Sequence, residues 1–268
     1  MASVEQNKQW WNELGWTEAG GDWSSPFGTP AMQWYASILP RIHPYLPATT
    51  ILEIAPGFGR WTQFLKGMCD TLMVVDLSEK CIDGCKERFK ADKNIQYHLN
   101  DGRSLAMIPD NAIDFLFTFD SLVHVEKDVI GEYLNQLVAK LTPQGVGFIH
   151  HSNLGAFSGH YAWVERLPRG RGLLSRLKLV EKGDHKRAKS MTADVFLSLA
   201  AAAGLKVVSQ EIINWQSQRP IDCLSVITRP GSIWDREYQR LVNQDFDREA
   251  AYIKKLSRLY DPRAVSGG

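Results

Sequence analysis

Short apolar runs alternate with amphipathic segments through most of the chain. A helical period predicts helices at residues 61–68, 79–90, 129–141 and 192–203. The apolar runs, which predict buried strands, occupy residues 50–54, 72–76, 94–99, 113–120, 146–150, 205–213 and 223–228. Strands that alternate with helices at this spacing are typical of a doubly wound α/β sheet. We therefore predict a seven-stranded, mostly parallel, Rossmann-like sheet.

The N-terminal part of the chain does not follow this pattern. After a short predicted helix at residues 4–14, tryptophans stand among glycines and prolines; the four are Trp10, Trp11, Trp16 and Trp23. Their large flat rings would suit an arm that covers a bound ligand. The alternative is that they only pack the arm against the domain. A second helix is expected from a Thr29 cap and Pro30 through Leu39, and Pro40, Pro44 and Pro47 should interrupt and end it before the first strand.

The chain ends in a highly charged segment. Its apolar residues between 232 and 260 recur mostly at helical spacing, which predicts one or two helices packed on the domain or on a second copy of the chain. We therefore expect an arm and helix at 1–47, a main domain at 48–230 and a helical tail at 231–268. Within the main domain, a basic segment at 155–190 is either an insertion over the substrate or a solvated loop.

Composition sets broad limits on function. The chain has 268 residues, of which 23% are charged, and a formal net charge of +1, so nothing favours nucleic acid or a membrane surface as partner. It has no run of about 18 apolar residues, no secretory signal at its start, and four cysteines without metal-ligand spacing. These features lead us to expect a cytoplasmic protein with reduced cysteines.

The turn after the first predicted strand is the most informative stretch. Glu53 ends the strand, Ala55, Gly57 and Gly59 follow, and Trp61 leads into the next helix. A strand, a glycine turn and a helix N-terminus form the usual geometry for holding a nucleotide-like ligand. A dinucleotide site would need G-x-G-x-x-G, and the missing third glycine disfavours a nicotinamide-dependent oxidoreductase. An ordinary structural turn is the other alternative.

Three later strands also end in an acid. Asp76 follows the second strand about 20 residues beyond the glycine turn, where ribose-binding carboxylates usually lie. Asp101 and Asp120 follow the third and fourth strands. Because the carboxyl ends of parallel strands meet along one edge, the four acids should line one ligand site. We expect the residues that follow these three acids to line it as well, namely Leu77, Gly102 and Ser121.

Residues 34–230 resemble the class I S-adenosylmethionine-dependent methyltransferases. Their E/D-x-G-x-G-x-G motif is matched from Glu53 to Gly59, with Ala55 in place of the first glycine. The resemblance implies S-adenosylmethionine as cofactor, with Glu53 helping to hold its methionine part and Asp101 contacting the adenine amino group. It also implies that the last two strands form an antiparallel hairpin whose tip approaches the substrate.

Histidines near the same edge are candidate catalysts. Neighbouring residues on a strand point to opposite faces, so at most one of His150 and His151 enters the cleft. Methyl transfer to an alcohol requires loss of a proton, which a histidine with a near-neutral pKa can accept. His151 is our first candidate base and His124 our second, with a divalent metal held by Asp120 and His151 as an alternative. A histidine pair bonded only to the backbone is the structural alternative.

Polar and aromatic residues on the arm, the fifth strand and the hairpin are candidate substrate contacts. They are Trp10, Tyr35, His150, Asn153, Asn214 and Asp222. The glycine turn, the tryptophan-rich arm and the His-His-Ser-Asn strand end resemble those of sugar and natural-product O-methyltransferases. We therefore predict methyl transfer by in-line displacement to a hydroxyl of a small molecule, such as a sugar or a glycosylated metabolite.

Other functions stay open at this point. N- or C-methylation of another small natural product would use the same cofactor site. A catalytically silent, methyltransferase-like partner subunit would fit the long charged tail, which also allows a homodimer. An RNA substrate is disfavoured because the sequence contains no separate basic, aromatic-rich binding module.

Overall fold

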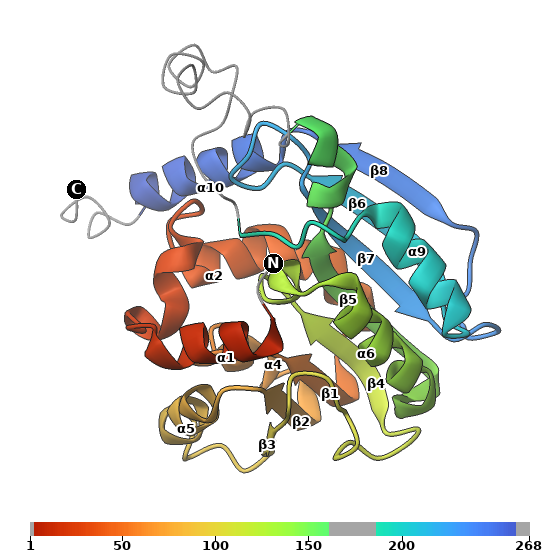
Figure 1. Cartoon of the computed structure of the whole chain (residues 1–268). Coiled ribbons are helices and arrows are strands. Elements are labelled where there is room, and N and C mark those ends of the chain that lie inside the picture. The colour runs from red at the N-terminus through yellow and green to blue at the C-terminus, as the bar shows by residue number, and fades with distance from the viewer. Residues whose placement is uncertain (1–2, 161–185, 261–268) are drawn as a thin grey trace.

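One mixed sheet forms the centre of the molecule (Figure 1). The computed structural model describes residues 3–160 and 186–260. The strands lie in the order β3-β2-β1-β4-β5-β7-β6-β8. They are β1 Ala48–Ile54, β2 Cys69–Asp76, β3 Ile95–Leu99, β4 Ile113–Thr118, β5 Leu141–Ser152, β6 Lys206–Ile213, β7 Asp222–Thr228 and β8 Gln239–Asn243.

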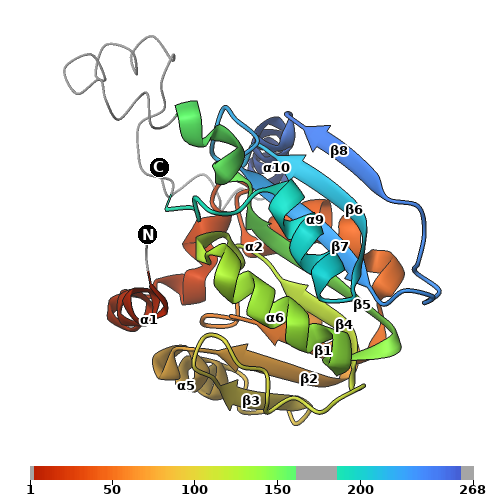
Figure 2. The same ribbon diagram turned by 45° about the vertical axis from the view of Figure 1, so that its right-hand side comes forward.

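The pairing confirms a doubly wound α/β sheet with an antiparallel hairpin. Strands β1 to β5 pair in parallel, whereas β7 runs antiparallel to both β5 and β6. The predicted count of seven strands is wrong by one, because β8 adds a parallel strand beside β6 at the edge of the sheet (Figure 2). This strand comes from the tail, which we expected to be wholly helical. Trp234, Tyr238 and Leu241 recur every three or four residues and so imitate a helical period.

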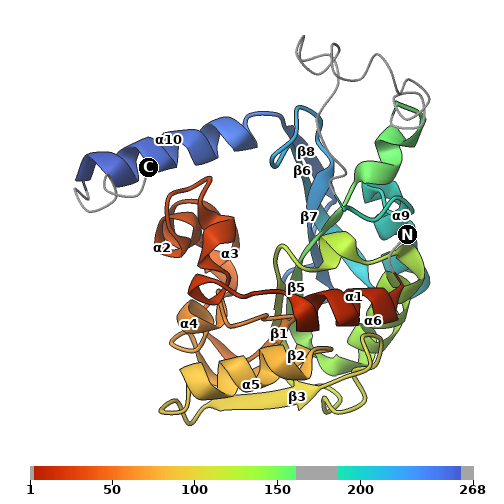
Figure 3. The ribbon, with the colours of Figure 1, turned by 60° about the vertical axis from the view of Figure 1, so that its left-hand side comes forward.

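Helices cover both faces of the sheet (Figure 3). The face that we call the α10 face carries α2, α3, α4, α5 and α10, and the opposite α9 face carries α6 and α9. The helices are α1 Val4–Glu13, α2 Pro30–Gln33, α3 Leu39–Ile42, α4 Thr62–Leu65, α5 Glu79–Arg88, α6 Lys127–Lys140, α9 Ala193–Ala202 and α10 Phe246–Tyr260. Within the described residues, no helix combines the length and apolarity that crossing a membrane requires.

Shorter helical turns connect these elements. The 3-10 turns are η1 Glu18–Ser24, η3 His43–Tyr45, η4 Leu122–His124 and η5 Leu154–Phe157. A π-helical turn, η2 Trp34–Ile38, joins α2 to α3. The predicted interruption at Pro40 is therefore wrong: Pro40 lies in the first turn of α3, where its missing N–H costs little.

Alternation along the central strands decides which side chains face which layer. On β4, Phe115 and Phe117 belong to the core of the α10 face, whereas Leu116 belongs to that of the α9 face. On β5, Phe148 faces α10 and Ile149 faces α9. Since successive residues of a strand point to opposite faces, this phase continues into the polar end of β5.

Candidate active site

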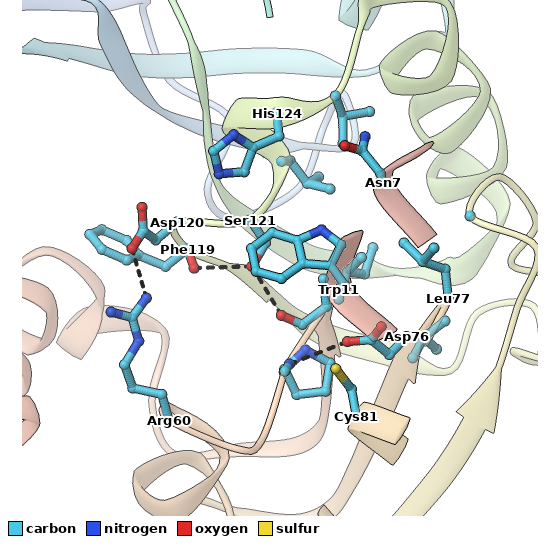
Figure 4. Close-up of a pocket in the computed structure, with 18 of the residues that line it drawn as sticks. Asn7, Trp11, Arg60, Asp76, Leu77, Cys81, Phe119, Asp120, Ser121 and His124 are labelled. Carbon is cyan, nitrogen blue, oxygen red and sulfur yellow. Dashed lines mark hydrogen bonds and ion pairs between the residues drawn. The ribbon is translucent and has the colours of Figure 1, made fainter. Parts of the chain in front are cut away.

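A pocket opens where the carboxyl ends of the parallel strands meet. Its empty space is about 800 Å³, including the open mouth. The walls come from the turn after β1, the ends of β2 and β3, and the segment after β4, and the arm lies across them with Trp11, Trp16 and Trp23. Figure 4 shows Asp76 and Leu77 on one side of the pocket, and Arg60 and Asp120 on the other.

The turn after β1 approaches the pocket closely through its backbone. Ala55 and Gly57 both line the pocket and both have positive φ angles, of 58° and 56°. Ala55, which replaces the first glycine of the motif, thus adopts a left-handed conformation that costs an ordinary residue about 1–2 kcal/mol. A Cβ atom on Gly57 would lie 2.7 Å from the ring of Trp16, so only glycine leaves room for the arm. Gly59 instead packs on Phe89, outside the pocket wall.

Asp76 lies in the pocket, as the sequence predicts. Its carboxylate accepts hydrogen bonds from the backbone N–H groups of Ser78, at 2.8 Å, and Gly57, at 3.2 Å. Burial raises the pKa of Asp76 to about 6, although these N–H groups favour the charged form. A partly desolvated carboxylate beside the apolar Leu77 is suited to accept hydrogen bonds from ribose hydroxyls.

Two other predicted acids lie outside the pocket wall. Glu53 is buried behind the glycine turn, where its Oε2 accepts a 2.6 Å hydrogen bond from Thr62. Burial raises the pKa of Glu53 to about 8. Asp101 is exposed, and its Oδ1 accepts from the backbone N–H groups of Arg103 and Ser104, so the pocket geometry does not support its predicted contact with adenine, which stays a prediction. The wall at this point is formed by its neighbours Asn100 and Gly102.

An ion pair closes the side of the pocket opposite Asp76. Arg60 Nη2 donates to Asp120 Oδ2 at 2.8 Å, and the guanidinium lies 4.5 Å from the Trp61 ring and 5.4 Å from the Trp23 ring. Burial alone would raise the pKa of Asp120, but Arg60 and other nearby charges hold it below its ordinary value. Asp120 has a φ of 64°, and next to it Ser121 donates a hydrogen bond to the Ala55 carbonyl. No local sequence pattern indicates a role for Arg60, because its partner Asp120 is sixty residues away along the chain.

His124 is the histidine that lines the pocket. Its Nδ1 lies 2.6 Å from the backbone oxygen of Lys186. A carbonyl oxygen can only accept, so Nδ1 carries the proton and Nε2 keeps its lone pair. Burial, followed by the nearby Arg187 charge, lowers the pKa of His124 and favours this neutral form.

The prediction that His151 enters the cleft is wrong. His151 stacks on Phe196 of α9 with ring centroids 4.1 Å apart, and its nitrogens contact the Ser152 carbonyl and the Ser225 hydroxyl. It is fully buried, and burial lowers its pKa to about 3. The metal alternative loses its second ligand with it. Across the described residues, no three His, Cys, Asp or Glu side chains group in a way that could hold a metal ion.

His150 faces the α10 side, next to the pocket. Its Nδ1 accepts a hydrogen bond from the backbone N–H of Asp120 at 3.0 Å, which places the ring proton on Nε2. The ring lies against Phe119, with centroids 4.7 Å apart. The Oδ2 atom of Asp222 is 3.6 Å from Nε2. The predicted substrate contact His150 therefore lies behind Phe119, which lines the pocket.

The other predicted substrate residues lie outside the pocket wall. Asp222 forms a bidentate ion pair with Arg187. The Nε of Arg187 donates to Oδ1 and its Nη2 donates to Oδ2, each at 2.9 Å. Asn153 bonds Pro220 and Ala193, and Asn214 accepts from the Asp247 N–H. These three roles as direct substrate contacts are therefore not supported by the pocket geometry.

The remaining predictions concern the N-terminal arm and helix and the insertion at 155–190. Tyr35 is 61% exposed and lies outside the pocket wall, so the pocket geometry does not support its predicted substrate contact, which stays a prediction. Trp10 packs edge-on against His124, with centroids 6.1 Å apart. Most of the predicted insertion, residues 161–185, lies outside the described residues.

Comparisons with known proteins agree with this architecture. Residues 51–145 match a family model described as a methyltransferase domain. The ribosomal RNA small subunit methyltransferase A of Coxiella burnetii is 24% identical over 139 residues, which are 46% of this chain and 53% of that protein. The chain thus spans about half the length of this curated relative.

Solved structures share the fold at low sequence identity. An S-adenosylmethionine dependent methyltransferase from Mesorhizobium loti is 18% identical, with a TM-score of 0.52 over 74% of this chain and 98% of that chain. A SAM-dependent methyltransferase from Leishmania major is 14% identical, with a TM-score of 0.55 over 84% of this chain and 82% of that chain. These likenesses show a methyltransferase-like fold, residues 51–145 match the methyltransferase domain model, and S-adenosylmethionine is the cofactor that this fold implies.

Proposed function

We propose that this protein transfers a methyl group from S-adenosylmethionine to a hydroxyl group of a small molecule. A sugar or a glycosylated metabolite is the proposed acceptor. The observation that carries the proposal is the presence, in one pocket, of a ribose-binding type of carboxylate, Asp76, and a neutral histidine with an available lone pair, His124.

The residues on the Asp76 side of the pocket fit the cofactor. Asp76 would accept hydrogen bonds from the ribose hydroxyls, Leu77 would pack on the adenine, and the glycine turn would bring backbone close to the methionine part. The rings of Trp11 and Trp16 offer π faces that attract a positively charged sulfonium. When bound, S-adenosylmethionine supplies an electrophilic methyl group.

His124 is the proposed general base, in place of His151. The acceptor hydroxyl would lose its proton to Nε2 of His124 while its oxygen forms the new bond to the methyl carbon, whose bond to the sulfonium sulfur would break so that S-adenosylhomocysteine leaves. The Lys186 carbonyl orients the ring and would stabilise the proton that remains on Nδ1 when the imidazole becomes cationic. A general base of this kind contributes typically about 10²- to 10⁴-fold in rate.

The arm favours a small acceptor over a nucleic acid. Its three tryptophans lie across the pocket and reduce the opening through which an RNA base would have to enter. The likeness to a ribosomal RNA methyltransferase covers only about half of that protein and leaves its substrate as an alternative to be tested. N- or C-methylation and a catalytically silent role are further alternatives.

Methyl transfer from labelled S-adenosylmethionine to a panel of acceptors tests this proposal. The panel should contain sugars and glycosides, amines, and ribosomal RNA. We expect label in the hydroxylated small molecules, with a higher initial rate for the wild type than for His124→Gln. Label in ribosomal RNA or in amines alone would contradict the acceptor class. Cofactor binding without transfer to any acceptor would favour the silent alternative.

A further inference from the structure

The first helix of the arm places one polar side chain in the wall of the pocket. Val4, Asn7 and Trp11 follow one another on α1 at intervals of three and four residues, so they share one face of the helix. Asn7 and Trp11 line the pocket, and Cγ1 of Val4 lies 2.6 Å from where a Cβ atom on Gly102 would be. Along this face, the carboxamide of Asn7 is therefore a polar group between two apolar side chains.

Asn7 belongs to the end of the pocket that Leu77 and Gly102 form. A Cβ atom on Gly102 would lie 3.7 Å from Cβ of Leu77, so these two residues adjoin each other. Figure 4 shows Asn7 and Leu77 on the same side of the pocket, away from Arg60 and Asp120. Since Leu77 follows the proposed ribose-binding carboxylate and is the residue expected to pack on adenine, the Asn7 carboxamide lies in the part of the pocket that suits the base.

The Asn7 carboxamide is open to a ligand. Its side chain is half-buried, and no hydrogen bond joins it to another of residues 3–160 and 186–260. Asn12 on the same helix differs, because its Oδ1 accepts a 2.6 Å hydrogen bond from the Ser78 hydroxyl and it lies outside the pocket wall. The two asparagines of α1 are therefore a matched pair, of which one has a partner in the protein and the other faces the pocket.

Hydrogen bonds fix α1 beside the cofactor side of the pocket. Besides the bond from Ser78, Nζ of Lys80 donates to the backbone oxygens of Asn12 and Leu14, at 3.0 and 2.9 Å. The backbone N–H of Ser78 also donates to Asp76. The end of α1 is thus bonded to the same turn that holds the Asp76 carboxylate, which gives Asn7 a defined position relative to the ribose site.

The other polar groups at this end of the pocket are bonded within the protein. Nδ2 of Asn100 donates to the Ser104 carbonyl and to the Tyr133 hydroxyl, and its Oδ1 accepts from the Gly102 N–H. A carboxamide presents a donor and an acceptor side by side, whereas a hydroxyl such as that of Tyr133 has one donor. The edge of adenine likewise presents an amino group next to a ring nitrogen, so a free carboxamide is its natural partner.

We infer that Asn7 recognises the adenine base of the cofactor, so that the arm selects the base and the end of β3 does not. The carboxamide oxygen accepts from the 6-amino group, and the nitrogen donates to a neighbouring ring nitrogen. Asp101, to which the family resemblance assigns the amino group, is exposed outside the pocket wall. The inference concerns cofactor binding alone and does not depend on which acceptor is methylated.

Competition by two nucleosides tests this role in the full-length protein. Adenosine and purine riboside differ only in the 6-amino group, and the affinity of each is measured by displacement of S-adenosylhomocysteine. We expect the wild type to bind adenosine roughly tenfold more tightly, which corresponds to one good hydrogen bond. In Asn7→Leu, which removes both polar groups at similar volume, the two nucleosides should bind equally. An undiminished preference in Asn7→Leu, or no preference in the wild type, would overturn the inference.

Three further variants separate recognition of the base from placement of the arm. Asn12→Leu makes the same substitution outside the pocket wall, and by loosening α1 it should weaken both nucleosides by the same factor. Asp101→Asn and Tyr133→Phe should keep the preference for adenosine. If either of these two loses the preference while Asn7→Leu keeps it, the base is recognised by that residue and the inference is wrong. Failure of the wild type to bind S-adenosylhomocysteine would refute the cofactor itself, and this inference with it.

Discussion

The Nδ1 atom of His124 lies 2.6 Å from the carbonyl oxygen of Lys186. This contact joins the segment after β4 to the segment that precedes α9 and fixes which ring nitrogen carries the proton. The nitrogen that remains available belongs to a ring that lines the pocket. The proposed role of His124 as general base depends on this contact.

Replacing His124 should therefore slow the reaction without weakening cofactor binding. We expect His124→Gln to lower kcat by about 10²-fold or more while the Kd for S-adenosylhomocysteine stays within about twofold. His43→Gln is a matched control, because His43 also places Nδ1 near a carbonyl, that of Pro40, but is exposed outside the pocket. An unchanged kcat for His124→Gln would show that another group takes the proton, or that the acceptor needs no base.

Glu53 should make the protein less stable as the pH rises. Burial raises its pKa from 4.5 to about 8, so between these values the native state holds a proton that the unfolded state has lost. Stability must then fall with rising pH, by up to about 1.4 kcal/mol per pH unit, until the pH passes the folded-state pKa. Glu53→Gln cannot titrate and should show a flatter profile by urea unfolding. A slope equal to that of the wild type would contradict the assignment, and the exposed Glu79→Gln serves as control.

Gly57 tests the contact between the glycine turn and the arm. In Gly57→Ala the added Cβ would meet the Trp16 ring at 2.7 Å, at a φ of 56° that disfavours alanine. We expect a stability loss of about 1–2 kcal/mol, and S-adenosylhomocysteine binding weakened roughly tenfold or more because the arm is displaced. Gly67→Ala is the control, since its Cβ would meet nothing closer than 3.9 Å. Unchanged affinity in Gly57→Ala would show that the arm does not cover the cofactor.

Asp222 should affect stability and leave cofactor affinity unchanged. Its carboxylate is fully buried against Arg187, which holds the pKa of Asp222 well below its usual range although burial alone would raise it. Asp222→Asn would leave a buried guanidinium without its counter-charge and should cost about 3–5 kcal/mol in chemical denaturation. Asp245→Asn, which removes an exposed pair with Arg248, should change stability by less than about 1 kcal/mol. Equal effects of the two changes would contradict this view of Asp222.

The sequence was sufficient for the features that depend on local pattern. Alternating strands and helices indicated the sheet, and acids at strand ends placed Asp76 and Asp120 on the ligand edge, because parallel strands bring their carboxyl ends together. The glycine turn was also recognisable, although the functional roles of these residues stay predictions.

The sequence alone does not predict which face of the sheet each residue of a buried strand points to. Because side chains alternate along a strand, only one of His150 and His151 could face the cleft. The prediction that His151 does so is wrong. The phase of β5 is set by Phe148 and Ile149, which are both apolar and both buried, so hydrophobicity cannot distinguish the two faces. Arg60 was missed for a different reason, since its partner Asp120 is brought near only by the fold.

Binding of S-adenosylhomocysteine, measured by calorimetric titration of the purified protein, tests the central claim most directly. Asp76→Asn is the companion variant, because it removes the carboxylate charge with little change in shape, and NAD is the control ligand. We predict saturable binding of S-adenosylhomocysteine to the wild type, a large loss of affinity in Asp76→Asn and no binding of NAD. Tight binding of NAD, or S-adenosylhomocysteine affinity that is the same in both proteins, would contradict the account.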